Sequence, residues 1–329
     1  FDTLQISASP LYKDNLNQHN LIYIDFSKMP AECSSYTSYI SRIEKRLKTD
    51  LLKDFPDAEC SMEDALWDIL DSIFDVYHGQ KFLFVMDEWD YIFHRDFVLD
   101  EDRKRYLQFL SNLLKDKAYV EMAYMTGILP IKKYGTHSAL NMFTEYSMTD
   151  PGELAPFFGF TEQEVQLLCE KYDMNFDEAR AWYDGYELIS HRRTGDIHYA
   201  MYSPKSVVEA MLRHKFGTYW DQTETYEALK VYIQMDMDGL KDAVVEMLAG
   251  ASVRINTGTF ANDVTTFATK DDVLTLLVHL GYLTYDSENE TVTIPNKEVS
   301  REYVNAISTM DWHGVIQSVQ ASRELLSAL

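Results

Sequence analysis

The sequence predicts an α/β fold built on a parallel sheet, because short apolar runs alternate with segments of helical periodicity. Three runs have the length and composition of strands, at 21–26, 82–86 and 122–126. The middle run, Phe-Leu-Phe-Val-Met, is apolar on both faces of a strand, as in the interior of a parallel sheet. The order strand, helix, strand, helix, strand favours right-handed crossovers that place the strands side by side.

Cap residues predict where the helices between these strands begin and end. Ser34 and Ser35 precede an amphipathic segment and can cap it. The next helix is expected to start at Ser61, with Asp64 placed as in a capping box, and to stop at Gly79. The third predicted helix leads directly into the third strand.

The 329 residues suit about two domains, and the pattern divides them further. Residues 1–150 form the predicted α/β part, and 151–235 form a predicted helical region. A helix, two short strands and a helix within 236–305 have the outline of a winged-helix module. Residues 306–329 are expected to be a linker toward a further domain.

The helical prediction for 151–235 rests on cap signals. Asn175 with Glu178 has the spacing of a capping box, and Gly185 stands where that helix is expected to end. Ser203 followed by Pro204 is a cap with proline at the first helical position.

Charge and composition narrow the classes of function. Thirty basic and fifty-three acidic residues give a net charge of −23, which disfavours a nucleic-acid grip over the whole surface but leaves a local one open. No run approaches the roughly 18 apolar residues of a membrane helix. Three cysteines without CxxC spacing fit a reducing, cytoplasmic setting: Cys33, Cys60 and Cys169.

The strongest local signal for chemistry is the pair Asp87 and Glu88, which directly follows the middle apolar run. The carboxyl edge of a parallel sheet is where α/β ligand sites form. In Mg²⁺-dependent nucleotide hydrolases the first carboxylate positions the ion and the next polarises the attacking water. The alternative is a solvated strand end, since the Asp-Glu dipeptide occurs twice more in this acidic chain.

Two further residues are candidates for contact with phosphate. Thr126 ends the third strand and can touch a γ-phosphate or orient the water if its strand lies beside the one that ends at Asp87. The alternative is a threonine that bonds its own turn. Arg95 can face phosphate, or it can simply lie in water.

Several catalytic patterns are absent from the sequence. A phosphate-cradling loop has the pattern GxxxxGK[ST], but none of the thirteen glycines is followed by lysine. HExxH and GxSxG are also missing, which leaves zinc-protease and serine-hydrolase chemistry without support. The aromatic cluster at 182–186 can stack bases, but its helical spacing favours packing.

Six segments in order resemble the bacterial and archaeal AAA-ATPase-like proteins, which often carry a PD-(D/E)XK-type nuclease domain after the ATPase part. The family usually has asparagine where Ser203 stands here, and the likeness extends over nearly the whole chain. The segments that carry it are 22–27, 84–90, 124–129, 182–186, 202–207 and 219–220.

The resemblance implies an ASCE-type P-loop NTPase core, without its first strand and P-loop in this chain, followed by a helical lid. It implies ATP and Mg²⁺ as ligands, with Asp87 as the Walker B magnesium residue, Glu88 as the base and Thr126 at the sensor position. The Walker A loop is expected before Phe1 and a nuclease domain, where present, after Leu329. Arg95 is a candidate arginine finger.

Two other functions remain open at this stage. One is a degenerate, non-catalytic scaffold that binds partners. The other is a DNA-contacting module of a DNA-processing system, for which the compact basic clusters are 103–105 and 191–193. The sequence leaves the oligomeric state open.

Overall fold

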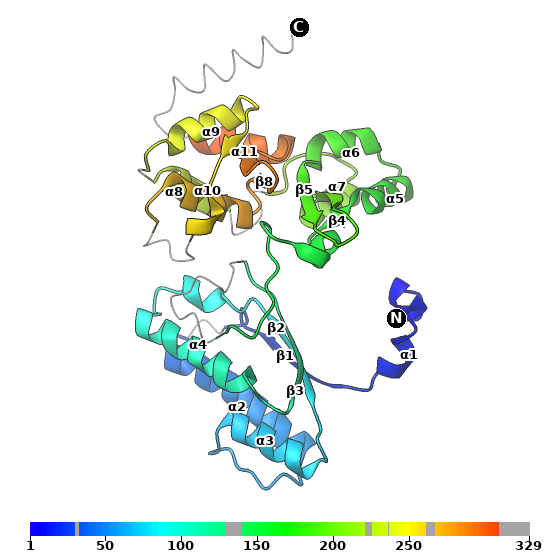
Figure 1. The fold of residues 1–329 in the computed structure, drawn as a ribbon, viewed down its shortest axis with the longest axis vertical. Helices are drawn as coiled ribbons and strands as arrows, with labels where there is room; N and C mark the ends of the chain where they lie inside the picture. The colour runs from blue at the N-terminus through cyan, green and yellow to red at the C-terminus, as the bar shows by residue number, and fades with distance from the viewer. Residues whose placement is uncertain (30–32, 129–139, 221–225, 236, 261–266, 309–329) are drawn as a thin grey trace. The chain divides into compact units, whose positions relative to one another are not determined.

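The protein was analysed as a computed structural model, which describes residues 1–29, 33–128, 140–220, 226–235, 237–260 and 267–308 (Figure 1). The chain divides into two compact units, Phe1–Thr144 and Glu145–Leu329, and each is considered by itself. The finer division predicted from the sequence stays a prediction, and most of the expected linker, 309–329, lies outside the described residues.

The first unit contains the predicted parallel sheet. Its strands are β1 (Asn20–Asp25), β2 (Phe82–Asp87) and β3 (Val120–Met125), in the order β1-β2-β3, and both pairings are parallel. The prediction of an α/β fold with a parallel sheet is confirmed, with the Phe-Leu-Phe-Val-Met run as the central strand. The helical elements of this unit are η1 (Gln5–Ala8), α1 (Tyr12–Asn15), α2 (Tyr36–Asp54), α3 (Leu66–Val76), η2 (Tyr91–His94) and α4 (Asp100–Leu114).

Only one face of this sheet is covered by the described residues. Ile22, Ile24 and Phe84 are buried in the main apolar cluster of the unit. On the opposite face Tyr23 and Tyr124 remain about half exposed, at 51% and 50%. Figure 1 shows α2, α3 and α4 on one side of the sheet, while η1 and α1 stand away from its other side. The central run was expected to be apolar on both faces, but the described chain gives it only one packing layer.

The helix ends test the cap predictions directly. Ser35 is the N-cap of α2 and its side chain accepts a hydrogen bond from the Ser38 amide, as predicted. The helix expected to start at Ser61 begins five residues later, at Leu66. Asp64 does accept bonds from the Ser61 amide and hydroxyl, at 2.7 and 3.1 Å. These bonds close only a turn, because Ala65 is extended with ψ at 148° and interrupts the helical path.

The second unit contains two three-stranded antiparallel sheets. One has the order β4-β6-β5 and the other the order β7-β9-β8. The strands are β4 (Phe160–Thr161), β5 (Tyr186–Ser190), β6 (Ile197–Tyr202), β7 (Val253–Arg254), β8 (Thr284–Asp286) and β9 (Thr291–Thr293). The helices are η4 (Gly152–Phe157), α5 (Glu162–Tyr172), α6 (Phe176–Tyr183), α7 (Pro204–Arg213), α8 (Tyr226–Ile233), α9 (Leu240–Leu248), η6 (Thr257–Thr259), α10 (Lys270–His279) and α11 (Lys297–Ser308).

The prediction that 151–235 is helical is wrong in part, because β5 and β6 form a hairpin between α6 and α7. The predicted helix starts on either side are correct, since Asn175 accepts from the Glu178 amide and Pro204 opens α7, but the Ser203 side chain makes no cap hydrogen bond. The two strands between these helices are short, and a polar loop separates them. Their sequence therefore shows no helical periodicity and only a weak strand pattern. The hairpin buries Leu188 on the core side.

Residues 240–308 hold the elements on which the winged-helix prediction rests. Helix α10 is followed by the antiparallel pair β8 and β9 and then by α11, and a further strand, β7, joins β9. The winged-helix assignment itself stays a prediction.

The buried carboxylate of Glu298 accepts hydrogen bonds from the amides of Tyr219 and Trp220 at 2.6 and 3.0 Å. Glu298 therefore fixes this pair of residues to α11.

The aromatic cluster at 182–186 serves packing in this unit. Trp182 is 9% exposed and Tyr183 is fully buried. The Lys297 ammonium and the Arg301 guanidinium lie 4.3 and 4.5 Å from the centroid of the Trp182 ring. Neither ring is free to stack on a base, so the packing interpretation is the one that the structure supports.

Candidate functional site

Three polar side chains lie where the parallel strands end. Asp25 and Asp87 are partners at the last position of β1 and β2, and Thr126 directly follows β3. The Thr126 amide donates to the Met86 carbonyl at 2.8 Å, which continues the pairing of the two strands. The carboxyl ends of parallel strands meet at one edge, so these side chains come together although they are far apart in the sequence.

The Asp87 carboxylate is held through both of its oxygens. The Thr126 hydroxyl donates to Oδ1 at 2.5 Å, and the Tyr23 hydroxyl donates to Oδ2 at 3.3 Å. Thr126 therefore bonds Asp87 rather than its own turn. Desolvation, followed by the charges of Asp87 and Asp25, raises the pKa of the Tyr23 hydroxyl above its ordinary value.

A second carboxylate, Asp25, is stabilised in its charged form next to the first. The Ser27 amide and hydroxyl donate to its Oδ1 at 3.0 and 2.6 Å, and the Lys28 ammonium lies 3.1 Å from Oδ2. The bond from the Ser27 hydroxyl, and after it the Lys28 bond, hold the pKa of Asp25 below its usual range. Sequence reasoning did not assign Asp25 to the site, because Asp25 lies inside the predicted apolar run at 21–26 and only the structure shows that β1 ends there.

The loop after β2 is fixed by backbone hydrogen bonds. Glu88 is exposed and has a left-handed backbone with φ of 50°, a conformation that costs a residue with a side chain about 1 kcal/mol. The Trp89 amide donates to the Thr126 carbonyl at 3.0 Å, and the Tyr106 hydroxyl donates to the Trp89 carbonyl at 2.7 Å. The strained backbone of Glu88 is therefore held between the half-buried Asp87 and the buried Trp89.

Gly127 and Asp90 lock the loops after β2 and β3 together. Asp90 is 2% exposed, and its Oδ2 accepts from the Ile128 amide at 3.0 Å. A Cβ at position 127 would lie 2.5 Å from the Trp89 ring and 2.6 Å from Asp90 Oδ1. Only glycine leaves room for this approach, a role that sequence reasoning did not assign.

We expect Gly127→Ala to destabilise the first unit by about 1–3 kcal/mol, because the added methyl group forces Trp89 and the buried Asp90 apart. Urea unfolding followed by circular dichroism measures the change. Gly217→Ala is the control, since the nearest atom to its added Cβ is the Tyr219 ring at 3.9 Å. Equal stability of both variants would contradict the proposed close contact.

The structure does not bring Arg95 to the Asp87 carboxylate. Its guanidinium lies 4.0 Å from the centroid of the Tyr91 ring, at the end of η2. The side-chain hydrogen bonds described for the Asp87 carboxylate come from Thr126 and Tyr23, not from Arg95. Its predicted contact with nucleotide remains untested.

The oxygen ligands at this edge of the sheet suit Mg²⁺ that is bound together with substrate phosphates. Within the described ranges no group of three or more His, Cys, Asp or Glu side chains is arranged to hold an ion by itself. Mg²⁺ characteristically binds through one or two carboxylates together with substrate phosphates and waters. Asp87, with the Asp25 carboxylate and the Thr126 hydroxyl nearby, provides hard oxygen ligands of that kind, so the residues fit the ion as part of a nucleotide complex.

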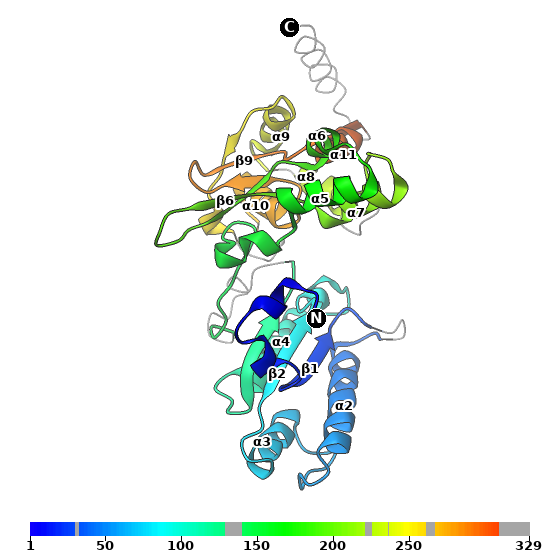
Figure 2. The same cartoon turned by 90° about the vertical axis from the view of Figure 1, so that its right-hand side faces the viewer.

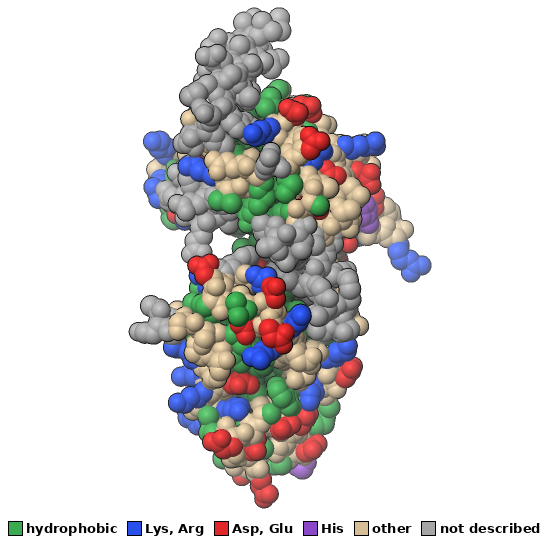
Figure 3. Space-filling view, turned by 90° about the vertical axis from the view of Figure 1, so that its left-hand side faces the viewer, with side chains coloured by type: hydrophobic (Ala, Val, Ile, Leu, Met, Phe, Trp, Pro, Cys, Tyr) green, Lys and Arg blue, Asp and Glu red, His purple; other side chains and the backbone are tan. Residues whose placement is uncertain are grey.

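Two properties of the surface bear on partners. In the part of the chain that the structure describes, no helix is long and apolar enough to cross a membrane. On the face shown in Figure 3, lysine and arginine side chains are scattered among acidic ones. Among the described residues on that face, no extended basic patch is visible.

The comparisons with known proteins are limited in reach. No family model matches the chain. An uncharacterized protein in the vnfD 5′ region of Azotobacter chroococcum mcd 1 is 28% identical over 153 residues, which is 45% of this chain and 28% of that protein. The chain thus matches little more than a quarter of that relative's length. The ORC2 protein of Aeropyrum pernix, solved as ADPNP-ADP complexes, aligns with 92% of this chain and 88% of its own at 12% identity, but its TM-score of 0.30 is too low to carry an argument.

Proposed function

We propose that the first unit is the carboxylate-bearing half of an Mg-ATP site, in an ATPase module of the AAA-ATPase-like kind. The observation that carries the proposal is the junction of β2 and β3, where Thr126 donates to Asp87 at the carboxyl edge of a parallel sheet. A carboxylate and a hydroxyl on neighbouring strands at this edge are what a Walker B residue and a sensor residue require.

In this proposal each residue has a separate role. Asp87 holds Mg²⁺ and its waters, and the ion neutralises charge on the β- and γ-phosphates when nucleotide is bound. Glu88 follows at the exposed strand end and accepts a proton from the attacking water. Thr126 orients Asp87 and contacts the γ-phosphate side of the site. Arg95 is retained only as a candidate phosphate contact.

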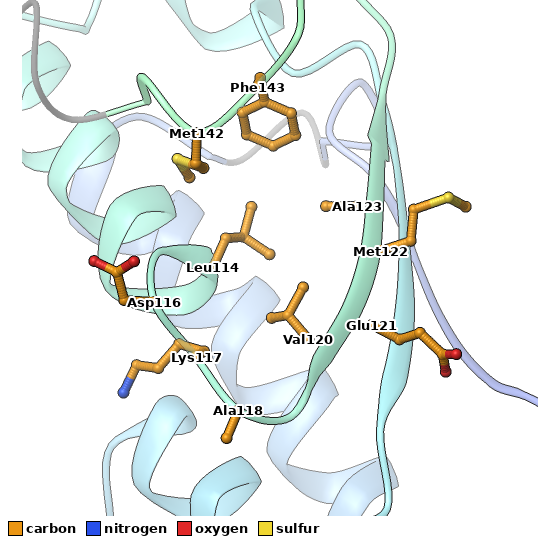
Figure 4. A pocket seen from close by; sticks show the side chains of 10 residues that line it. All are labelled: Leu114, Asp116, Lys117, Ala118, Val120, Glu121, Met122, Ala123, Met142 and Phe143. Atoms are coloured by element: carbon orange, nitrogen blue, oxygen red, sulfur yellow. The ribbon is translucent and has the colours of Figure 1, made fainter.

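The missing half of the site is a phosphate-binding loop, which we propose precedes Phe1 in the complete protein. The outer edge of β3 supports this, since no described strand pairs with it. A groove of about 510 Å³ runs beside that edge, between the end of α4 and β3 (Figure 4). Its apolar lining includes Leu114, Val120 and Phe143. A further strand can extend the sheet here, and a helix can cover the open face that carries Tyr23 and Tyr124.

We expect the present chain to bind Mg-ATP no tighter than the millimolar range, about −4 kcal/mol, because the amides and lysine of a phosphate loop supply much of the grip on the phosphates. Isothermal calorimetry on this chain tests the expectation. Submicromolar binding would contradict it.

The second experiment uses the protein expressed with its upstream coding sequence, which is assayed for Mg²⁺-dependent ATP hydrolysis. An upstream sequence without a GxxxxGK[ST] loop would count against an ATPase.

The ATPase cycle is proposed to act on a partner or a fused nuclease domain. This part rests on the family resemblance alone. The alternative is a non-catalytic scaffold, which a start codon close upstream of Phe1 without a phosphate loop would favour. In that case Asp87 and Glu88 would be relics, and restoring the upstream segment would produce no turnover.

A further inference from the structure

Tyr23 lies on the open face of the parallel sheet, close to the carboxylate that we propose holds Mg²⁺. Alternate residues of a strand point to the same face, so Tyr23 shares its face with Asp25, and Val85 shares it with Asp87. Figure 2 turns this face toward the viewer, with β1 and β2 side by side. Tyr23 pairs in register with Val85, which makes Asp87 its diagonal neighbour on β2. An aromatic side chain is long enough to reach a diagonal neighbour on the next strand.

Tyr124 on β3 has the same position relative to Asp87, on the other side of β2. It also pairs in register with Val85, and its exposed fraction is 50%, against 51% for Tyr23. The register therefore leaves the two tyrosines equivalent. The side-chain hydrogen bonds described for Asp87 nevertheless come from Tyr23 and Thr126. The hydrogen bond distinguishes Tyr23 from Tyr124.

The Asp87 carboxylate is bonded from both flanking strands. Thr126, directly after β3, donates to Oδ1 at 2.5 Å, and Tyr23, within β1, donates to Oδ2 at 3.3 Å. The usual range for a hydroxyl donor is about 2.5–3.0 Å, so the first bond is short and the second is long. A carboxylate oxygen has two lone pairs, and Oδ2 can accept the Tyr23 hydroxyl and still bind a cation. The two donors thus fix the plane of the carboxylate while Oδ2 stays available.

The neighbouring carboxylate, Asp25, has donors of its own. The Ser27 hydroxyl donates to Asp25 Oδ1 at 2.6 Å, and the Lys28 ammonium lies 3.1 Å from Oδ2. The hydrogen bond described for the Tyr23 hydroxyl goes to Asp87 instead. The structure therefore associates Tyr23 with the proposed magnesium ligand rather than with Asp25.

We propose that Tyr23 is a positioning residue, which sets the Mg²⁺ affinity of the site by orienting the Asp87 carboxylate. This inference rests on the proposed function, because it takes Asp87 as the magnesium ligand. Hydrogen-bond partners of a metal-ligating carboxylate orient it, and loss of such a partner typically lowers metal affinity about 10- to 100-fold. Tyr23 acts through Asp87 and has no contact with the reacting atoms in this proposal.

The other interpretation of Tyr23 is a purely structural one, in which its ring only adds apolar surface to the open face. Tyr23→Phe separates the two interpretations, since it keeps the ring and removes the hydroxyl that Asp87 accepts. Tyr124→Phe is the matched control, because it removes a hydroxyl from the same row of the same face at nearly equal exposure. A structural role predicts that the two variants behave alike, and a positioning role predicts that they differ.

The test measures ATP affinity by equilibrium dialysis, once with Mg²⁺ and once with EDTA, in the protein that carries its phosphate loop. Tyr23→Phe is expected to weaken Mg-ATP binding about 10-fold and to leave the affinity for metal-free ATP unchanged. Tyr124→Phe is expected to change neither affinity. Urea unfolding of both variants is expected to match the unchanged protein, which shows that the folds are intact.

The possible failures of this proposal and of the proposed function are distinguishable. If Asp87→Asn weakens Mg-ATP binding but Tyr23→Phe does not, Tyr23 has no positioning role and the proposed function stands. Equal losses with Mg²⁺ and with EDTA, or equal losses in the two tyrosine variants, would assign Tyr23 a packing role and overturn the inference. If Mg²⁺ does not strengthen ATP binding in the unchanged protein, or if Asp87→Asn has no effect, both the proposed function and this inference fail.

Discussion

Glu88→Gln is expected to lower ATP turnover by about 10²–10⁴-fold in the protein that carries its phosphate loop, with little change in Mg-ATP affinity. The amide keeps the size of the side chain but cannot accept a proton from the attacking water. Glu88 lies beyond the last sheet residue, and the hydrogen bonds described for the Asp87 carboxylate come from Thr126 and Tyr23, so we expect the proposed magnesium ligand to stay in place.

The matched control is Glu101→Gln, which makes the same change in another Asp-Glu dipeptide, in the first turn of α4. It removes the same charge from another exposed position and should leave turnover unchanged. Asp87→Asn should behave differently from both, since it weakens Mg-ATP binding itself. Single-turnover kinetics together with calorimetry separate these effects. Normal turnover in the Glu88 variant would remove this residue from the mechanism.

Gly185→Ala should cause the largest loss of stability in the second unit, more than about 3 kcal/mol. A Cβ at this position would lie 1.7 Å from the carbonyl oxygen of Pro295, a main-chain atom that no side-chain rotation can move. Its φ of +130° adds strain for any residue with a side chain. The Asn296 side chain donates to the Tyr183 carbonyl at 3.3 Å, so the same contact joins the end of α6 to the start of α11.

The control for this variant is Gly195→Ala in the hairpin loop. Gly195 has a similar φ of +120°, but nothing lies within 4 Å of its added Cβ. The difference between the two variants therefore isolates the steric contact with Pro295 from the backbone strain. Chemical unfolding followed by fluorescence measures both. A loss in the Gly185 variant no larger than in the control would show that the α6 and α11 segments separate without cost.

Much of the first unit follows from local sequence. Each of its three strands is a short apolar run, and helical segments between them require parallel pairing, so the order of elements and the position of Asp87 were predictable. Ser35 caps α2 because a side-chain oxygen next to an amphipathic segment satisfies a free amide. The start of α3 was not predictable in this way, since Ser61 and Asp64 make the same local bonds in a turn as in a helix.

The sequence by itself determined the fold class of the first unit, the order of its strands and, within one or two residues, where they lie, because these depend on periodicity and on residues close together in the chain. Only the tertiary structure decided that Thr126 and Tyr23 bond Asp87, that Asp25 belongs to the same edge, and that Arg95 packs on Tyr91. These contacts join residues distant in sequence, and their geometry depends on sheet register and on the close approach at glycine, which no local pattern specifies.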